Sequence, residues 1–250
     1  MIEDLLLAID ESVPEYALAP LFALDQFQAE GLSATMFYET SDHHGLPHDP
    51  FKSCVMPRPI GWLTTLSAEG VVNLAPFSFF NGVSSNPPVV VVGINGRQPH
   101  GPKDTLTNCR ATGEFVANMA TWDLREAMNL TSASLPAEVD EMALAGLTPA
   151  PCNLVKPPRV RESPINLECR VLQFVELPCD DPDARNTAVF GHVVGIHIDD
   201  SVLTDGLVDT AKIKPISRLG YMDYAVVEEV FEMRRPSVEQ AMADRKNAAE

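Results

Sequence analysis

The sequence lacks the signals that mark several classes of protein. None of its apolar runs approaches the roughly 18 residues that a membrane-spanning helix needs, so no membrane association is expected. Its first residues are acidic, whereas a secretory signal peptide begins with basic residues and ends at a small-residue cleavage site. Its five cysteines form no Cys-x-x-Cys pair, and their odd number leaves at least one unpaired. We therefore expect a cytoplasmic protein with reduced thiols.

Positive charge is also scarce. The 250 residues include 18 Lys and Arg against 35 Asp and Glu, which gives a formal net charge of −17. A chain of this charge repels a phosphate backbone, so nucleic acid is not an expected partner. A hydrophobic content of 45% with 21% charged residues is typical of a folded globular chain, and the length favours one domain with terminal additions.

The few basic residues are unevenly distributed. Residues 1–50 contain ten carboxylates and no Lys or Arg, whereas residues 51–113 contain five basic residues and only two acidic ones. A basic region in an acidic protein suits the binding of one small anion, and chance clustering of solvated charges is the alternative interpretation. The five basic residues are Lys52, Arg58, Arg97, Lys103 and Arg110.

The pattern along the chain predicts three parts. Residues 1–50 form an acidic N-terminal arm, in which helices are expected at 3–9 and 14–30. Residues 51–236 form the main domain. Residues 237–250 form a polar, helix-prone tail.

The main domain has the pattern of a mainly β protein. Strands are expected at 60–67, 71–75, 89–94, 114–120, 166–177 and 188–198, with the last two forming an antiparallel pair. Helices are expected at 102–110, 121–130 and 136–145. Because the helices are inserted and do not alternate with the strands, the pattern favours a β-barrel over a doubly wound sheet. The continuous apolar run Val89–Val92 predicts a strand that is covered on both faces.

Several common site motifs are absent or defective. Gly96–Lys103 nearly matches a nucleotide-phosphate loop, but Pro102 lacks the N–H that the phosphate needs, and Asp104 stands where a magnesium-binding Ser or Thr is required. There is no Gly-x-Gly-x-x-Gly after a strand, so a Rossmann dinucleotide site has no support. There is also no Gly-x-Ser-x-Gly motif of a hydrolase.

The histidines do not predict a metal site. His44 and His48 are four residues apart, but the intervening Gly45 favours a solvated loop over a helix. His192 and His197 differ by five positions within one expected strand, so their side chains point to opposite faces and cannot share a ligand.

The stretch Ala75–Phe80 concentrates three aromatic residues in four positions and is bracketed by Asn73 and Asn81. Packing in a hydrophobic core is one interpretation. The other is a flat apolar slot with amide donors at its edge, which suits a planar heteroaromatic ligand.

Three blocks of this region, Pro57–Thr65, Asn73–Phe80 and Asn86–Pro88, resemble the opening motifs of the flavin reductase-like, FMN-binding split-barrel family. The resemblance spans about residues 55–236, with its blocks in order and at natural spacing. The later blocks are Lys103–Asn108, Thr112–Asn118, Pro157–Ser163, Leu167–Cys169, Arg218–Tyr224 and Arg235–Pro236.

The resemblance implies a homodimer of Greek-key split β-barrels, each of about six strands with inserted and terminal helices. It also implies one FMN, or FAD, in each of two grooves at the interface. The residues that it places around the flavin are Trp62, Thr64 and Thr65 along the groove, Asn73, Ala75, Pro76, Phe77 and Ser78 beside the ring system, and Lys103, Thr105 and Asn108 near the phosphate, with Arg58 as a further candidate.

One departure from the family pattern concerns the last long strand. The family commonly has Gly-Glu-Val, and this chain has Gly191-His192-Val193. His192 is therefore a candidate for the substrate side of the flavin, where an imidazole in place of a carboxylate would alter donor choice or pH response. A surface or dimer-contact histidine is the alternative.

The expected activity is hydride transfer from NADH or NADPH to the flavin. This transfer requires stacked rings and no obligatory acid or base from the protein, so no catalytic residue is assigned. The reduced flavin would serve a partner monooxygenase or another electron acceptor. The alternatives are a non-enzymatic FMN-binding electron carrier or flavin store that another protein reduces, an oxidase that acts on a small molecule directly, and a dimeric scaffold with an empty groove.

Overall fold

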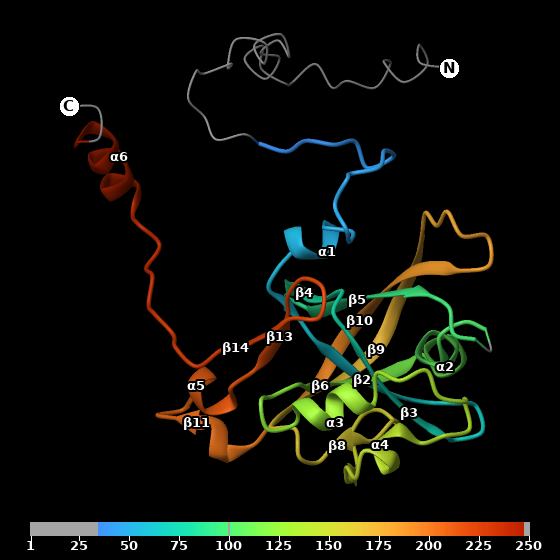
Figure 1. The fold of residues 1–250 in the computed structure, drawn as a ribbon. Helices are drawn as coiled ribbons and strands as arrows, with labels where there is room; N and C mark the ends of the chain where they lie inside the picture. The colour runs from blue at the N-terminus through green and yellow to red at the C-terminus, as the bar shows by residue number, and fades with distance from the viewer. Residues whose placement is uncertain (1–34, 100, 248–250) are drawn as a thin grey trace, which may run out of the picture. The chain divides into compact units, whose positions relative to one another are not determined.

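The structure is a computed structural model that describes residues 35–99 and 101–247 (Figure 1). The chain divides into two units, Met1–Pro47 and His48–Glu250. The helices expected at 3–9 and 14–30 lie outside the described residues. No described helix is long and apolar enough to span a bilayer.

The second unit is built on one seven-stranded antiparallel sheet with the strand order β3-β2-β6-β9-β10-β5-β4. This sheet confirms the mainly β fold class, and the long β9 and β10 form the expected antiparallel pair. Sequence analysis missed β4. The strands are β2 (Gly61–Leu66), β3 (Val72–Phe77), β4 (Phe80–Ser85), β5 (Pro88–Gly96), β6 (Glu114–Met119), β9 (Ile165–Leu177) and β10 (Arg185–Ile198).

Smaller elements surround this sheet. A three-stranded sheet has the order β1-β13-β14, and the pairs β7–β8 and β11–β12 form two short ladders. These strands are β1 (Arg58–Pro59), β7 (Pro149–Ala150), β8 (Arg159–Val160), β11 (Leu203–Thr204), β12 (Leu207–Val208), β13 (Ile216–Arg218) and β14 (Tyr224–Val226). The helices are α1 (Phe51–Cys54), α2 (Asp104–Thr112), α3 (Arg125–Leu130), α4 (Glu141–Leu144), the 3₁₀ helix η4 (Asp200–Val202), α5 (Thr210–Ile213) and α6 (Val238–Asn247).

Two inserted helices are shorter than the sequence predicted. The helix expected at 136–145 begins only at Glu141, because the side chain of Asp140 caps it by accepting a 3.0 Å hydrogen bond from the backbone N–H of Ala143. Gly146, with a φ of 69°, follows the end of this helix as expected. The helix expected at 121–130 begins at Arg125.

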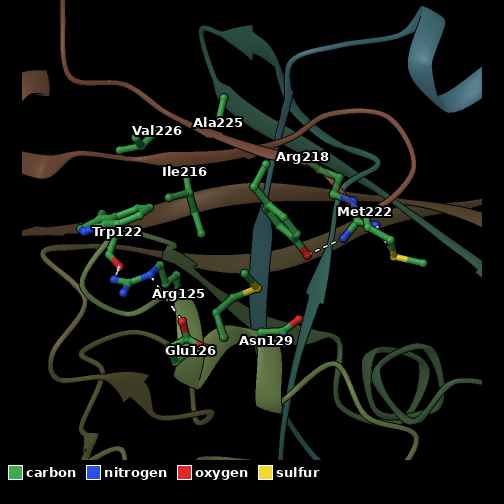
Figure 2. A pocket seen from close by; sticks show the side chains of 11 residues that line it. Trp122, Arg125, Glu126, Asn129, Ile216, Arg218, Met222, Ala225 and Val226 are labelled. Carbon is green, nitrogen blue, oxygen red and sulfur yellow. Dashed lines mark hydrogen bonds and ion pairs between the residues drawn. The ribbon is translucent and has the colours of Figure 1, made fainter.

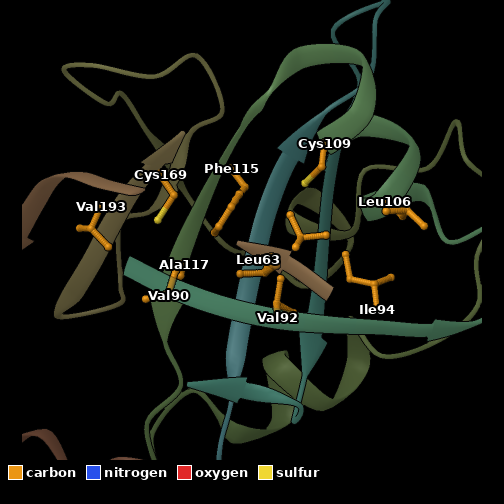
Figure 3. Packing of buried hydrophobic residues seen from close by; sticks show 11 residues of the cluster. Leu63, Val90, Val92, Ile94, Leu106, Cys109, Phe115, Ala117, Cys169 and Val193 are labelled. Atoms are coloured by element: carbon orange, nitrogen blue, oxygen red, sulfur yellow. The ribbon is translucent and has the colours of Figure 1, made fainter. Parts of the chain in front are cut away.

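Strand β2 separates two hydrophobic clusters. Successive side chains of a strand point to opposite faces, so Leu63 joins one cluster and Trp62 joins the other, and both are fully buried. Figure 3 shows the first cluster, in which Leu63 lies near Val92 of β5 and Phe115 of β6. Strand β2 is therefore covered on both faces.

The expectation that Val89–Val92 is covered on both faces is not met within one chain. Val90 and Val92 are buried in the first cluster, whereas Val89 and Val91 are only half-buried. The strand therefore has a fully covered face and a partly exposed one, as is usual in an antiparallel sheet.

One glycine of β10 is required by close packing. A Cβ atom on Gly191 would overlap the ring of Phe115 and would lie 3.3 Å from the Cβ of Cys169. The absence of a side chain at this position lets the ring of Phe115 fill the interior beneath β10.

Candidate functional site

A network of four polar side chains joins helix α2 to the paired strands β2 and β3. The side-chain amide of Asn73 donates hydrogen bonds of 3.0 Å to the hydroxyl oxygens of Thr65 and Thr105. The amide of Asn108 donates a 3.1 Å hydrogen bond to the same Thr65 oxygen. All four side chains are buried. A satisfied network in a low-dielectric interior holds its members in fixed positions.

A small pocket lies beside this network. Six residues that the sequence associated with the flavin line it together: Asn73, Ala75, Pro76, Phe77, Lys103 and Thr105. The remaining lining residues are Gln98, Asp104, Thr131, Ser132, Ala133, Ser134 and Glu141. Four separate stretches of the sequence, 73–77, 98–105, 131–134 and Glu141, therefore meet at the end of β3 and the start of α2.

The start of α2 supplies this pocket with one cationic side chain and a helix N-terminus. Lys103 is the residue that precedes the first turn of this nine-residue helix, and no side chain caps the helix there. The first backbone N–H groups of a helix and its dipole favour an anion at this end. Asp104 also lines the pocket and adds one negative charge. The backbone N–H of Asp104 donates a 3.4 Å hydrogen bond to the side-chain oxygen of Gln98. The arrangement suits a small anionic group.

Sequence analysis missed Glu141, a buried carboxyl group of the same pocket. Its Oε2 accepts a 3.0 Å hydrogen bond from the backbone N–H of Leu74, and it thereby satisfies a donor on the edge strand β3. Burial raises the pKa of Glu141, and the charges of Asp104 and Asp140 act in the same direction, against two backbone hydrogen bonds. No local pattern distinguishes it from a solvated acidic residue at a helix start.

Trp62 and Thr64 belong to β2 but do not line the pocket. The indole N–H of Trp62 donates a 2.9 Å hydrogen bond to the hydroxyl of Thr131, which does line it. The hydroxyl of Thr64 accepts a 2.9 Å hydrogen bond from the side-chain amide of Asn118. Both side chains are fully buried, and Trp62 reaches the pocket through Thr131.

Arg58 lies beside Ser78 and does not line the pocket. Its guanidinium donates to the backbone carbonyls of Lys52, Val55 and Leu219, at 2.6 Å for Val55 and 2.9 Å for Leu219. Its Nε lies 3.5 Å from the hydroxyl oxygen of Ser78. These contacts hold α1 and the end of β13 together. Contact of Arg58 and Ser78 with the flavin stays a prediction.

His192 lies half-buried on β10, where it pairs in register with Val89 of β5 and Arg170 of β9. It does not line the pocket that contains Lys103. A role for His192 on the substrate side of the flavin stays a prediction.

The structure brings Cys152, Glu168 and His197 together, with potential metal-ligating atoms within 4.8 Å of one another. Glu168 accepts hydrogen bonds from His197 at 2.5 Å and from the backbone N–H groups of residues 153–155. Burial opposes ionisation of Glu168, but the hydrogen bonds from Asn153 and His197 hold its pKa below the ordinary value. These bonds occupy both carboxylate oxygens, so the cluster fixes the 153–155 loop.

Comparison with known proteins agrees with the arrangement of these elements. Residues 52–217 match the flavin reductase like domain. This chain belongs to that family. An uncharacterized protein of Aquifex aeolicus is 40% identical to this flavin reductase-like protein over 167 residues, which is 66% of this chain and 82% of the relative.

Solved structures show a similar fold. The nitrilotriacetate monooxygenase component B of Bacillus cereus is 32% identical, with a TM-score of 0.73 over 81% of this chain and all of that one. A protein with a split barrel domain from Shewanella frigidimarina is 24% identical, with a TM-score of 0.63 over 72% of this chain and 86% of that one. The split-barrel fold is thereby confirmed. Flavin reductase-type chemistry with a flavin cofactor follows from the family.

Proposed function

We propose that the protein is an NAD(P)H-dependent flavin reductase that holds the phosphate of FMN in the pocket at the start of α2. The observation that carries this proposal is that one pocket gathers Lys103, Thr105 and the α2 N-terminus with Asn73, Pro76 and Phe77. A cation, a helix N-terminus and hydroxyl and amide groups form a donor set suited to a phosphate dianion.

The buried network prepares the pocket for that phosphate. Asn73 holds the hydroxyl of Thr105 from the β3 side, so the first turn of α2 is fixed before any ligand binds. Because burial raises the pKa of Glu141, this carboxyl group resists ionisation beside the anion. In a chain of net charge −17, these features allow one phosphate to bind where most of the surface repels it.

The ring system would lie along the end of β3. Pro76 and Phe77 supply apolar surface there, and Ser78 follows at the end of the strand. Bound FMN supplies the hydride acceptor, and the chain contributes orientation and exclusion of water. The absence of an assigned acid or base is consistent with such a division of roles.

We also propose a homodimer and a monooxygenase partner. The partly exposed face of β5 offers Val89 and Val91 for burial against a second copy. The partner is suggested by the name of the 32% identical Bacillus cereus protein, which is a monooxygenase component. Size-exclusion chromatography with light scattering tests the dimer, and an elution as a monomer would contradict it.

Two measurements test the activity. Titration of the apoprotein should quench the fluorescence of added FMN, and anaerobic addition of NADH or NADPH should bleach the visible absorbance of the bound flavin. Binding without bleaching by either donor would support an electron carrier that another protein reduces. Lack of FMN binding would contradict both the proposed flavin site and the reductase function.

A further inference from the structure

A second pocket of about 430 Å³ lies between α3 and the β13–β14 hairpin (Figure 2). Two arginines in it each lie over an aromatic ring. The guanidinium carbon of Arg125 is 4.0 Å from the ring centroid of Trp122, and that of Arg218 is 4.5 Å from the ring centroid of Tyr224. None of these four side chains lines the pocket that contains Lys103.

The positive charge of this pocket is poorly compensated. Arg218 pairs in register with Arg58, and no carboxylate in the described part of the chain forms an ion pair with either. Arg125 has only a 3.5 Å contact with Glu126, whose side chain is 84% exposed, and an exposed pair of this kind contributes little. Arg125 donates a 2.7 Å hydrogen bond to the carbonyl of Trp122, and Arg218 donates hydrogen bonds to the hydroxyl of Tyr224 and the carbonyl of Tyr221, so both guanidinium groups are held in place. The lining has two arginines and one carboxylate, that of Glu126, and an excess of positive charge in a strongly acidic chain favours an anionic ligand.

The base of the pocket is apolar. Met128 and Ile216 are buried beneath it, while Trp122 and Tyr224 remain 42% and 39% exposed. Exposed aromatic rings and planar guanidinium groups provide surfaces for stacking a planar ring. In Figure 2 Trp122 and Arg125 lie on a different side of the pocket from Arg218. Arg125 begins α3, and Arg218 belongs to β13. The ligand that fits combines a planar ring with an anionic group.

The pocket is adjacent to the proposed flavin site. Asn129 lines this pocket, and Thr131, two residues later, lines the pocket that contains Lys103. Two peptide units span at most about 7.6 Å between Cα atoms. On the opposite side, Arg218 adjoins Arg58, whose Nε lies 3.5 Å from Ser78. A ligand in this pocket that also reaches the flavin must therefore be elongated.

We propose that the pocket formed by Trp122, Arg125, Arg218 and Tyr224 binds the adenosine phosphate part of NAD(P)H, so that the nicotinamide reaches the neighbouring flavin. This inference rests on the proposed reductase function. A volume of about 430 Å³ lies within the usual range for small-molecule sites, about 300–1,000 Å³. The phosphate bound by the arginines is either the 5′-phosphate chain, common to both donors, or the 2′-phosphate of NADPH.

Trp122 provides a direct probe of binding. The chain has two tryptophans, and Trp62 is fully buried, so ligands in this pocket should alter mainly the fluorescence of Trp122. The FMN-loaded protein is titrated separately with 5′-ADP, 2′,5′-ADP and benzoate. Saturable quenching by either nucleotide, lost in Trp122→Phe, supports the proposal, and a preference for 2′,5′-ADP assigns the 2′-phosphate. Quenching by benzoate alone, or by none of the three, overturns it.

Arginine variants separate donor binding from the hydride step. Arg125→Gln and Arg218→Gln should each raise the KM for the nicotinamide donor by about tenfold to a hundredfold, as expected for loss of a charge-assisted hydrogen bond, while kcat and FMN affinity stay near wild type. Arg218→Lys should restore part of the loss because it keeps the charge. Arg161→Gln, an exposed arginine outside this pocket, is the matched control.

The two proposals fail in different ways. If neither donor bleaches the wild-type flavin, the reductase function is overturned, and the site inference that rests on it falls as well. If wild-type flavin is bleached but the arginine variants keep the wild-type KM, only the site inference is overturned. A Gln variant that raises KM only because it has lost FMN affinity also overturns it.

Discussion

The side-chain amide of Asn73 lies 3.0 Å from the hydroxyl oxygen of Thr105 and donates a hydrogen bond to it. This bond joins the edge strand β3 to the first turn of α2, across 32 residues of sequence. The proposed phosphate site depends on it, because Lys103 and the helix N-terminus are placed by that first turn.

Asn73→Ala removes the donor of two buried hydrogen bonds. The hydroxyl of Thr65 still accepts a hydrogen bond from Asn108, but the hydroxyl of Thr105 loses its hydrogen bond from Asn73. We therefore expect the free energy of unfolding to fall by about 1–3 kcal/mol. We also expect weaker FMN binding, measured by fluorescence quenching. Asn186→Ala, which removes a more exposed hydrogen bond to the Pro178 carbonyl, should cost much less. Equal losses in the two variants would contradict this prediction.

Lys103→Gln tests the phosphate site without disturbing the core. Removing this charge should weaken FMN binding by about tenfold and should reduce the dependence of affinity on salt concentration. The control Lys156→Gln removes an exposed lysine that does not line the pocket. An affinity for FMN that is the same in both variants and in the wild type would show that the phosphate binds elsewhere.

Glu141 predicts a pH dependence of stability. In the folded protein the pKa of Glu141 is raised above the ordinary value of 4.5. At a pH between 4.5 and this raised pKa, Glu141 is protonated in the folded protein and ionised in the unfolded chain. This contribution makes the protein less stable as pH rises through that window, and the loss is complete above the folded-state pKa. The variant Glu141→Gln keeps an oxygen for the Leu74 N–H and cannot ionise, so it should lack this slope.

Urea denaturation at a series of pH values, at fixed flavin concentration, measures the effect. Glu126→Gln is the control, because its side chain is 84% exposed. If the Glu141→Gln and wild-type stabilities run parallel between pH 4.5 and neutrality, the carboxyl group of Glu141 titrates normally.

Gly191→Ala should destabilise the barrel. The added methyl group would overlap the ring of Phe115, and overpacking of this kind costs about 1–3 kcal/mol. For a domain of this size, the melting temperature should fall by about 2–4 °C for each kcal/mol. Gly82→Ala on β4 is the matched control, because no atom lies within 4 Å of the added Cβ. A wild-type melting temperature in Gly191→Ala would show that Phe115 relaxes without cost.

Six of the residues that line the candidate site were predicted from the family resemblance, which is carried there by two short blocks of sequence. The turn at residues 68–70 pairs β2 with β3, and that register places Thr65 opposite Asn73. The basic residues between 51 and 113 suggested a small-anion site, and of these Lys103 lines the pocket. Arg58 does not line it, and Arg97 and Arg110 form ion pairs with Asp183 and Glu176, so the anion site stays a prediction. Strand positions followed from runs of apolar and β-branched residues.

Other features depend on contacts that no local pattern contains. Glu141 becomes part of the site only because α4 packs against β3, 67 residues away in the sequence. The stretch that contains Phe80 allowed either core packing or an aromatic slot. Phe80 begins β4, and its side chain packs against the first hydrophobic cluster and lies against Gly61. The two arginine–aromatic pairs of the second pocket likewise come from segments about 90 residues apart, which only the tertiary fold brings together.

The double burial of β2 has a consequence for insertions and deletions. A shift of this strand by one residue would turn Trp62 into the space that Leu63 fills and would move Thr65 away from Asn73. Such a change would disrupt both hydrophobic clusters and the anion pocket in a single step. Changes of length should therefore be tolerated at the 68–70 turn and rejected within the strand.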